Sequence, residues 1–482
     1  MWPCYSSTIP RFPTCSPANL LPKPHRLDTI NIFIIIPEIH NRSRQISLLN
    51  TNRHLTDVFR SLKYRNYRLF FYGQSISLIG TWMQRVAMSW LVYRLSNSAV
   101  ILGIVAFSGQ IPTFLLTPFG GVAADRYNRR RLLMATQILA TIQAVILATL
   151  VLTGVIAVWH LIILSIALGI INAFDMPTHQ SFVVQMIDNR EDLGNAIALN
   201  SSMVNVARLL GPSIAGLLIA TVGEGLCFTI NAASYLVVIT TLAIMSVTQQ
   251  KNTSKATVWQ QLKGGFSYAL GFAPVKYLIA FLALLSLAGM PYVVLMPIFA
   301  SDILHGGSRT FGFLMAASGV GALAGAIYLA RRKTVLGLGK VIVISSLLFG
   351  VGLIGFSLST VTWLSMLCML FAGLGMILLL ASSNTILQTL VEDDMRGRVM
   401  SLYTTAFVGS VPFGSLIAGY LASRIGAAHT LMIGGACCLF GSFLFSRKLP
   451  ALRKQVYPIY VRKGIIPAVS KGLQAATELP SL

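Results

Sequence analysis

A cluster of charge at residues 120–131 is the most concentrated source of polar chemistry in this sequence. The segment GGVAADRYNRRR places one Asp and four Arg within seven positions, although only 11% of the 482 residues are charged. A carboxylate beside guanidinium groups can form charge-assisted hydrogen bonds, which are shorter and stronger than neutral ones. Apolar stretches at 99–122 and 132–153 adjoin the cluster. Such bonds would therefore form where two long apolar elements end.

The apolar stretches identify the class of protein. Hydrophobic residues make up 55% of the chain, and apolar runs of about 20 residues are what a bilayer requires. Backbone polar groups in lipid must be paired internally, so these runs predict transmembrane helices. Runs such as 341–391 do not alternate, which excludes a membrane β-barrel. We expect an all-α, polytopic membrane protein.

Cutting the apolar runs at charges and turn residues predicts twelve transmembrane helices. One boundary between helices cannot be placed from charged residues. Residues 132–174 contain no Asp, Glu, Lys or Arg, yet they are too many for a single span. Thr153 and Gly154 break that run, and Trp159 supplies an interfacial aromatic. The predicted helices lie near 69–93, 99–122, 132–153, 158–178, 196–222, 226–247, 277–300, 310–330, 341–359, 362–388, 399–422 and 427–446.

The basic residues orient these helices. With twelve spans, 26 Lys and Arg from residue 56 onward fall on the side that holds both termini, against three on the other side: Arg94, Arg309 and Arg424. The positive-inside rule therefore predicts an inner-membrane protein with both termini in the cytoplasm. The net charge of +23 could also suggest nucleic-acid binding. Its location in short segments between apolar runs argues against a nucleic-acid partner.

The spans divide the chain into five segments: an N-terminal extension (1–55), a six-helix bundle (56–247), a cytoplasmic linker (248–276), a second bundle (277–446) and a basic tail (447–482). Trp259, Leu262 and Phe266 share a helical face, so the linker should contain an amphipathic helix on the inner leaflet. Residues 1–54 are rich in Pro and Ser. They predict a disordered extension or a start codon placed too early, with a processed targeting segment as the alternative.

An internal repeat relates the two bundles. The segment GPSIAG at 211–216 recurs as GSLIAG at 414–419, a shift of 203 residues. Gly121 and Trp159 recur as Gly325 and Trp363 at a shift of 204. The halves are therefore parallel repeats of six helices, and such repeats imply two bundles that rock around a central cleft.

These motifs resemble those of the major facilitator superfamily. Residues 121–131 are similar to the signature loop between its second and third helices, although Asn128 replaces the usual second Gly; like Gly, Asn tolerates the left-handed conformation. The second copy has Leu329 in place of the Asp, and the antiporter-like motif in the fifth helix has Ala207 in place of one Gly. A narrower resemblance, over residues 56–446, is to the branch that contains the enterobactin exporter. It rests on RNYR at 65–68, WMQ at 82–84, WLVY at 90–93, NAFDMP at 172–177 and NSS at 200–202.

The resemblance implies a conformational latch. In the superfamily, the Asp and Arg of this loop hold helices together at the cytoplasmic face in the outward-open state. The corresponding residues are Gly121, Asp125, Arg126, Arg129 and Arg130, with Asp175 as an available partner, and the fifth-helix motif comprises Gly211, Pro212 and Gly216. The alternative is that the arginines only set topology.

Two arginines at membrane depth are the strongest candidates for contact with a substrate. Arg85 and Arg208 fall within the first and fifth predicted helices, which line the central cavity in the family, and Asn205 shares a face with Arg208. Ionisable groups at that depth are costly and mark functional sites. The alternative is that the arginines bond carbonyls and hold helices together. Further polar candidates, each of which could instead serve packing, are Gln84, Asn172, Tyr235, Tyr292, Asn384 and Gln388.

What the sequence lacks narrows the function. No Asp or Glu lies at mid-depth in a predicted span, so Asp175 is the only plausible titrating group near a cavity. The chain has no nucleotide-binding loop, and its six Cys lack metal-ligand spacing. We therefore expect no cofactor, metal site or enzymatic activity.

Together these features predict a secondary-active, ion-coupled exporter of small amphiphilic molecules that works by alternating access. Siderophore-like, metabolite and drug-like substrates all fit. The alternatives are an importer or a lipid flippase on the same fold, or a membrane scaffold or sensor that does not transport. The expected partners are the bilayer and a small-molecule substrate. Protons and an outer-membrane efflux partner are further possibilities.

Overall fold

The computed structural model describes residues 59–246, 271–332 and 334–465. They belong to one structural unit, Phe59–Leu482, and in the described residues every regular element is helical. The all-α prediction is confirmed. The predicted N-terminal extension and most of the linker, including its amphipathic helix, lie outside the described residues.

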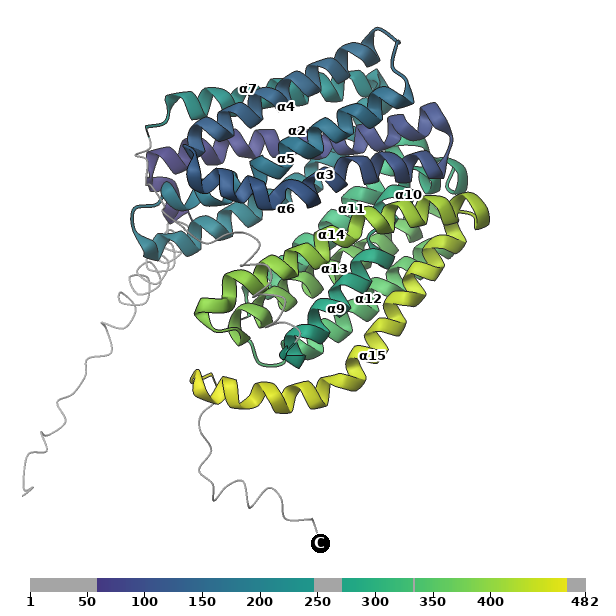
Figure 1. Ribbon diagram of the computed structural model, residues 1–482. Coiled ribbons are helices and arrows are strands. Elements are labelled where there is room, and N and C mark those ends of the chain that lie inside the picture. Colours follow the sequence, from purple (N-terminus) through teal and green to yellow (C-terminus); the bar gives the residue numbers. More distant parts are fainter. Residues whose placement is uncertain (1–58, 247–270, 333, 466–482) are drawn as a thin grey trace, which may run out of the picture. The chain divides into compact units, whose positions relative to one another are not determined.

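The first set of helices is preceded by a short 3-10 turn, η1 (Arg60–Lys63), and is coloured purple to teal in Figure 1. It contains α2 (Arg65–Ser96), α3 (Ala99–Arg126), α4 (Arg129–Leu152), α5 (Val158–Gln185), α6 (Arg190–Val222) and α7 (Glu224–Ile244).

The second set is coloured green to yellow in Figure 1. It contains α9 (Ala273–Gly289), α10 (Tyr292–Ile298), the π-helical turn η2 (Phe299–Ile303), α11 (Gly307–Ala330), α12 (Leu338–Leu358), α13 (Thr362–Leu390), α14 (Asp393–Ile425) and α15 (Ala427–Arg462).

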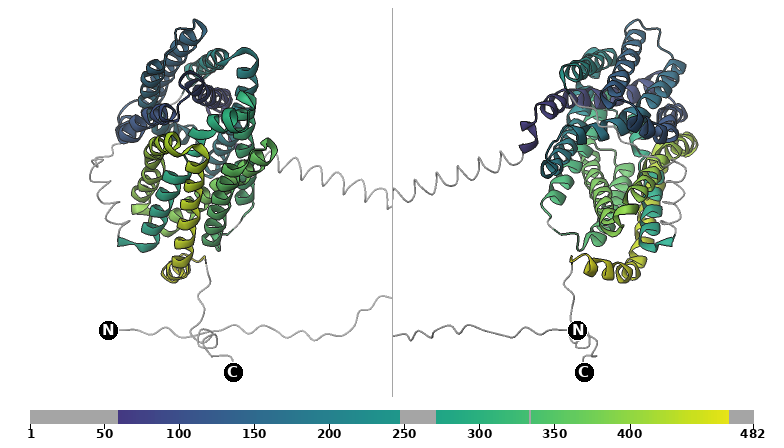
Figure 2. Two further views of the ribbon diagram at one scale, coloured as in Figure 1. Left: turned by 90° about the vertical axis from the view of Figure 1, so that its right-hand side faces the viewer. Right: turned by 60° about the vertical axis from the view of Figure 1, so that its left-hand side comes forward.

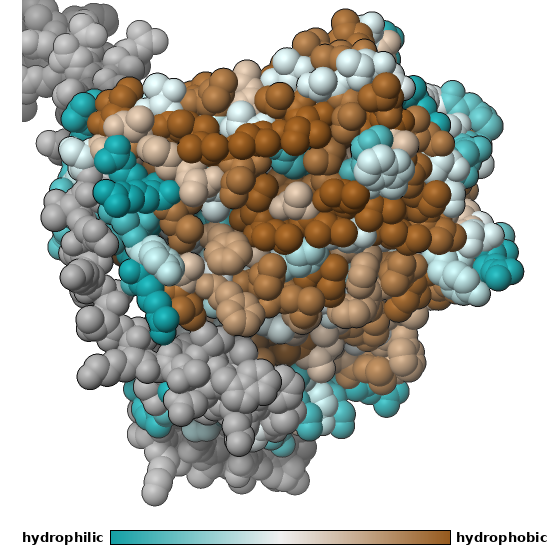
Figure 3. All heavy atoms as spheres, turned by 45° about the horizontal axis from the view of Figure 1, so that its top comes forward, coloured by the Kyte–Doolittle hydropathy of each residue, from teal (hydrophilic) through white to brown (hydrophobic). Residues whose placement is uncertain are grey.

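Each predicted span corresponds to helical structure. Among the described residues, eleven helices are long and apolar enough to cross a membrane, with α9, α10 and η2 counting as one span. The remaining predicted span is α2, which has 32 residues but is less apolar because it carries four arginines: Arg65, Arg68, Arg85 and Arg94. The face shown in Figure 3 is covered mainly by hydrophobic residues, with hydrophilic ones gathered toward its edges. The chain is a multi-pass membrane protein.

Matching glycines terminate matching helices in the two repeats. Gly223 separates α6 from α7 with φ of 85°, and Gly426 separates α14 from α15 with φ of 84°. Positive φ values favour glycine, which has no Cβ to clash with the backbone. The two glycines are 203 residues apart, the same spacing as the GPSIAG repeat, so the turn belongs to the repeated unit.

The seventh predicted span and the last one differ from expectation. The seventh is interrupted after Gly289, where Met290 and Pro291 separate α9 from α10. The last helix, α15, continues past the predicted end at 446 to Arg462, with Pro450 and Pro458 inside it. Figure 1 shows it changing direction along this part. The prediction ended the span before Arg447 and Lys448. Charged residues end the part of a helix that lies in the membrane, but the helix itself can continue beyond them.

The two sets pack in the same pattern. In the first set α3 contacts α5, α4 contacts α7, and α2 contacts both α6 and α7. In the second set α11 contacts α13, α12 contacts α15, and α9 contacts both α14 and α15. These pairs correspond one to one in repeat order, which confirms the parallel six-helix repeat. Figures 1 and 2 show the two sets as separate groups of helices.

Two helix crossings join the bundles: α6 with α11, and α3 with α14. A Cβ atom at Gly216 would lie 2.8 Å from the Cα of Gly312, and one at Gly419 would lie 3.0 Å from the Cα of Gly103. Gly216 and Gly419 are the last glycines of the repeated GPSIAG and GSLIAG segments. Small residues let membrane helices approach closely where lipid offers no hydrophobic driving force. Each repeat thus supplies one close crossing.

We expect Gly216→Ala to lower the apparent melting temperature of the purified protein, because the added methyl group would collide with α11 and overpacking costs about 1–3 kcal/mol. Gly194→Ala is the matched control in the same helix, since a Cβ there would meet no atom within 4 Å. Fluorescence-monitored thermal unfolding measures the difference. Equal melting temperatures for both variants would contradict this account of the crossing.

Candidate functional site

The signature loop lies at one end of the first bundle, between α3 and α4; we call this end, which carries Arg126 to Arg131, the basic end. The Asp125 carboxylate lies 3.6 Å from the Arg129 guanidinium, and its side chain is 45% exposed. Arg126 is exposed. Asn128 is not left-handed as the resemblance suggested: its φ is −65°, and its side chain accepts a hydrogen bond from the Arg131 backbone and caps α4.

Two arginines of the loop bind carbonyl oxygens of their own bundle. Arg129 donates to the carbonyls of Ala124 and Ser181, at 3.0 and 3.3 Å. Arg130 donates to those of Leu242 and Ala243, at 2.6 and 2.7 Å. These contacts fasten the loop to the ends of α5 and α7. In this state the loop charges hold the first bundle together.

Asp175 lies apart from the loop arginines, on the side of α5 that faces α4. Its carboxylate accepts hydrogen bonds from the hydroxyl of Thr136 at 2.6 Å and the amide of Gln137 at 3.0 Å. His179, one turn further along α5, packs its ring against Phe70 at a centroid distance of 4.9 Å. The structure therefore joins Asp175 to α4 rather than to the charged loop.

Of the two glycines that open the loop motif, Gly120 is the one under steric constraint. A Cβ there would lie 2.0 Å from the carbonyl oxygen of Ala173, whereas a Cβ at Gly121 would meet nothing within 4 Å. Gly121 was predicted instead, because the family pattern begins there. The glycine pair itself was the available signal for a close approach of α3 to α5.

The fifth-helix motif brings α6 against α2. A Cβ at Gly211 would lie 2.5 Å from the Cβ of Trp82, and the equivalent atom at Gly414 would lie 2.3 Å from the carbonyl oxygen of Leu287 in α9. Pro212 lies inside the helix directly after this contact. Each repeat therefore uses the first glycine of the motif within its bundle and the last one between bundles.

The two membrane-depth arginines meet at Trp82. The guanidinium carbons of Arg85 and Arg208 each lie 5.1 Å from the centroid of the Trp82 ring. Both arginines are therefore within twice that distance of each other, and they interact electrostatically. The sequence predicted both arginines; it did not indicate that an indole ring lies beside each of them.

The other polar candidates of the first bundle form interhelical hydrogen bonds. Gln84 donates to the side-chain oxygen of Gln143 at 3.2 Å and accepts from the amide of Asn231 at 2.7 Å. The Tyr235 hydroxyl lies 3.4 Å from that of Thr81. These bonds tie α2 to α4 and α7, as the packing alternative anticipated.

Tyr292 comes from the second bundle and lies near the arginines. It follows the interruption between α9 and α10, and its hydroxyl lies 3.1 Å from that of Ser318. Tyr292 interacts electrostatically with Arg208, as Tyr235 does with Arg85. Residues of both bundles therefore surround the arginine pair.

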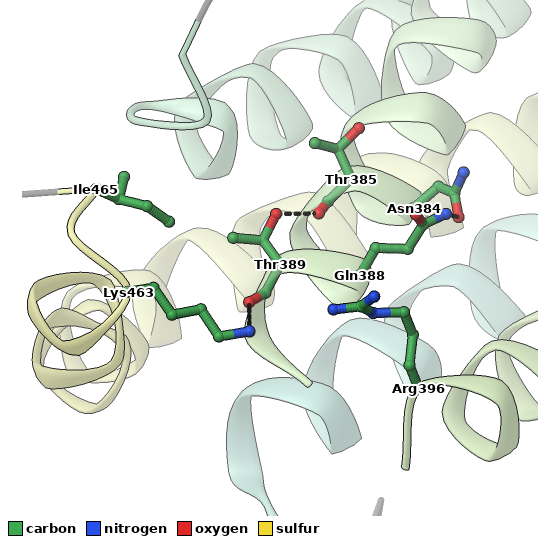
Figure 4. A pocket seen from close by; sticks show the side chains of 7 residues that line it. All are labelled: Asn384, Thr385, Gln388, Thr389, Arg396, Lys463 and Ile465. Carbon is green, nitrogen blue, oxygen red and sulfur yellow. Dashed lines mark hydrogen bonds between the residues drawn. The ribbon is translucent and has the colours of Figure 1, made fainter. Parts of the chain in front are cut away.

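The remaining candidates lie elsewhere. Asn205 donates to the carbonyl of Ser201 in its own helix, at 2.9 Å, and Asn172 is half-buried in α5. Asn384 and Gln388 hydrogen-bond each other at 3.1 Å. As Figure 4 shows, these last two line a pocket of about 570 Å³ together with Thr385, Thr389, Arg396, Lys463 and Ile465.

The bundles are closed at the end opposite the basic end, here called the far end. Tyr93 at the end of α2 donates to the carboxylate of Asp302 in η2, and Trp90 stacks on Phe311 with centroids 6.1 Å apart. Arg94 pairs with Glu224 of its own bundle through two hydrogen bonds of 2.8 and 3.1 Å. Asp302 was not predicted, although its position at the edge of a predicted span could have indicated it.

A second group that the sequence did not reveal anchors the chain before α2. Arg60 and Lys63 form ion pairs with Asp192, whose side chain is only 3% exposed, and Tyr64 donates to the same carboxylate at 2.8 Å. The hydrogen bond to Asp192 raises the pKa of Lys63 above its ordinary value. This anchor joins η1 to the start of α6 at the basic end.

Two parallel six-helix repeats, joined by two crossings around a pair of deep arginines, define a transporter of the major facilitator type. The structural comparison agrees. A bacterial homologue of the human lysosomal transporter Spinster, solved in an inward-facing and unoccupied conformation, has a TM-score of 0.61 at 13% identity; the match covers 83% of this chain and 97% of that one.

The chain belongs to the major facilitator family described as transmembrane secretion effectors, whose model matches residues 56–459. It is 25% identical over 386 residues to the staphyloferrin A transporter of Staphylococcus aureus, a match covering 79% of this chain and 96% of that protein. It is 23% identical to the multidrug efflux pump Tap of Mycolicibacterium fortuitum, covering 72% and 87%.

We expect Asp192→Ala to destabilise the protein, because it leaves Arg60 and Lys63 without their buried carboxylate partner. Asp188→Ala is the control, since Asp188 lies just before the same helix and is exposed. Thermal unfolding of both purified variants should show a lower melting temperature for Asp192→Ala alone. An unchanged melting temperature for Asp192→Ala would show that the anchor contributes nothing to stability.

Proposed function

We propose that this protein exports small amphiphilic molecules by alternating access, with its basic end in the cytoplasm. The observation that carries the proposal is the distribution of contacts between the bundles. At the far end Tyr93 bonds Asp302, and at the basic end, within the described residues, Arg129 and Arg130 contact Asp125 and backbone carbonyls, all of their own bundle. This is the arrangement of a transporter closed on one side and ready to receive substrate from the other.

The direction of transport is supported by the relatives and by topology. Two of the relatives are named as a transporter of staphyloferrin A and as a multidrug efflux pump. The excess of Lys and Arg supports our assignment of the basic end to the inside of the cell. A chain that takes substrate from the cytoplasm and releases it at the far end is an exporter. Siderophore-like, metabolite and drug-like compounds remain the substrate classes to test, and an importer or flippase is the alternative.

The energy source in this proposal is an ion gradient. Asp175 is the titratable group that we assign to coupling, because its carboxylate lies between α5 and α4 in the interior of the first bundle. An outer-membrane partner would then complete efflux from a cell with two membranes.

Transport assays on cells test the function directly. Cells with and without the protein would be loaded with a panel of fluorescent dyes, catecholates and carboxylates, and accumulation of each compound would be followed over time. Export predicts lower accumulation of at least one class when the protein is present. Higher accumulation would indicate an importer, and no change for any class would contradict transport of small amphiphiles.

We expect Asp125→Asn to slow transport while leaving expression and folding unchanged. In the present state Asp125 is half exposed and pairs only with Arg129, and such surface pairs contribute about 0–1 kcal/mol. The proposed role of Asp125 is in the opposite state, where the loop would latch the basic ends together. Initial export rates from cells measure the effect, with Asp188→Asn as the control. Full export by Asp125→Asn would remove the latch role.

A further inference from the structure

We propose that Arg85, Trp82 and Arg208 form the binding site for an organic anion that carries its charge on oxygen atoms, and specifically for an amphiphilic carboxylate. The proposal rests on the proposed transport function, because it names the class of substrate that the central site accepts. Three observations support it: the missing partners of the arginines, the way α6 is held at Arg208, and the aromatic residues around both.

The guanidinium of Arg208 has unused hydrogen-bonding capacity. Its Nε and Nη1 atoms are buried, and within the described residues neither has a hydrogen-bond partner. A buried donor left unpaired costs about 1–3 kcal/mol, and more when it is charged. These two donors therefore do not bond carbonyls to hold helices together, which was the alternative role for Arg208. They are available to an acceptor that arrives from outside the chain.

Arg85 adds a second positive charge without a neutralising carboxylate. Among the described residues, neither arginine forms an ion pair with Asp or Glu. Arg85 is exposed in the structure, yet its electrostatic neighbours are Tyr235 and Arg208. Its guanidinium carbon lies 5.1 Å from the centroid of the Trp82 ring, which also lies beside Arg208. Two like charges at membrane depth repel each other, and an anion between or beside them would relieve the repulsion.

Backbone packing fixes Arg208 at this place. On one side Gly211, one turn along α6, allows the helix to approach Trp82 of α2. On the other side a Cβ at Gly319 of α11 would lie 3.1 Å from the carbonyl oxygen of Arg208. The α6 segment at Arg208 is thus held between the two bundles. If the bundles rock, the distance between α6 and α11 near Arg208 changes. A ligand bound to Arg208 would therefore be affected by that movement.

Aromatic side chains indicate a ligand with an apolar body. Trp82 lies against both guanidinium groups, and cation–π contacts of this kind partly compensate buried charge. Tyr292 from the second bundle interacts electrostatically with Arg208. A carboxylate with an aromatic or aliphatic body would meet the arginines with its charged end and the Trp82 ring with the rest. A cationic dye would meet two positive charges.

The test uses three compounds that share a ring system and differ in charge: naphthylacetate, its neutral methyl ester, and naphthylmethylamine. Binding to the purified full-length protein is measured by calorimetry. We expect naphthylacetate to bind the wild type and Arg208→Gln to weaken that binding about tenfold or more, since hydrogen bonds to charged groups contribute about 1.5–3 kcal/mol. Arg208→Lys should recover only part, because the planar fork is lost.

The control is Arg424→Gln, which removes an exposed arginine that also lies over an aromatic ring, that of Tyr420, at 5.5 Å. It should leave binding of naphthylacetate unchanged. If Arg208→Gln does not fold, Arg85→Gln provides the same comparison at the other arginine. The proposal is overturned if the wild type does not bind naphthylacetate, or if Arg208→Gln weakens binding of all three compounds equally.

Transport measurements separate this proposal from the proposed function. Vesicles that contain the protein and are loaded with each compound give rates of movement across the membrane. Binding of naphthylacetate without transport of any compound would support the anion site and count against export. Transport that does not depend on charge would support export and overturn the anion site.

Discussion

Two close helix crossings, α6 with α11 and α3 with α14, hold the bundles together and determine what the rest of the structure can do. At each crossing the last glycine of a repeated motif, Gly216 or Gly419, faces a glycine of the other bundle. Backbone atoms that approach so closely leave no room for side chains between the helices. A small rotation about the crossing therefore moves the distant helix ends without separating interlocked side chains. The two bundles can therefore tilt as units around these crossings, which lie in the halves of the helices nearer the far end.

The charges are distributed in relation to these crossings. At the far end Tyr93 and Asp302 bridge the bundles, whereas Arg129 and Arg130 are occupied within the first bundle at the basic end. Between the ends lies Arg208, next to the backbone contact of α6 with Gly319. Because charge at membrane depth is expensive, Arg208 marks a candidate functional position between the two ends.

The sequence predicted the fold well, because apolar periodicity and length report directly on the lipid environment. All twelve spans, the parallel repeat and the family followed from residues such as the GPSIAG motif and the signature loop. The interruption before Tyr292 and the continuation of α15 to Arg462 were not predicted. Proline can interrupt a membrane helix or lie inside it, and a charged residue can end a membrane crossing without ending the helix.

The site was predicted less completely. Arg85 and Arg208 could be found as costly charges, but their common neighbour Trp82 depends on how α2 and α6 pack, which no single segment specifies. The anchoring carboxylate of Asp192 pairs with residues more than 100 positions away, and the Tyr93–Asp302 contact joins different bundles. Local spacing carries no signal for such contacts.

Distances between spin labels across both ends of the bundles test the central claim, that the bundles rock about the two crossings. Labels would replace exposed residues in a background without the six native cysteines: Tyr127 and Leu336 at the basic end, Val155 and Val361 at the far end. We predict that conditions that shorten the distance at the basic end, among added compounds and pH values, lengthen the one at the far end. A far-end distance that stays fixed while the basic end changes, or two distances that lengthen together, would contradict this account.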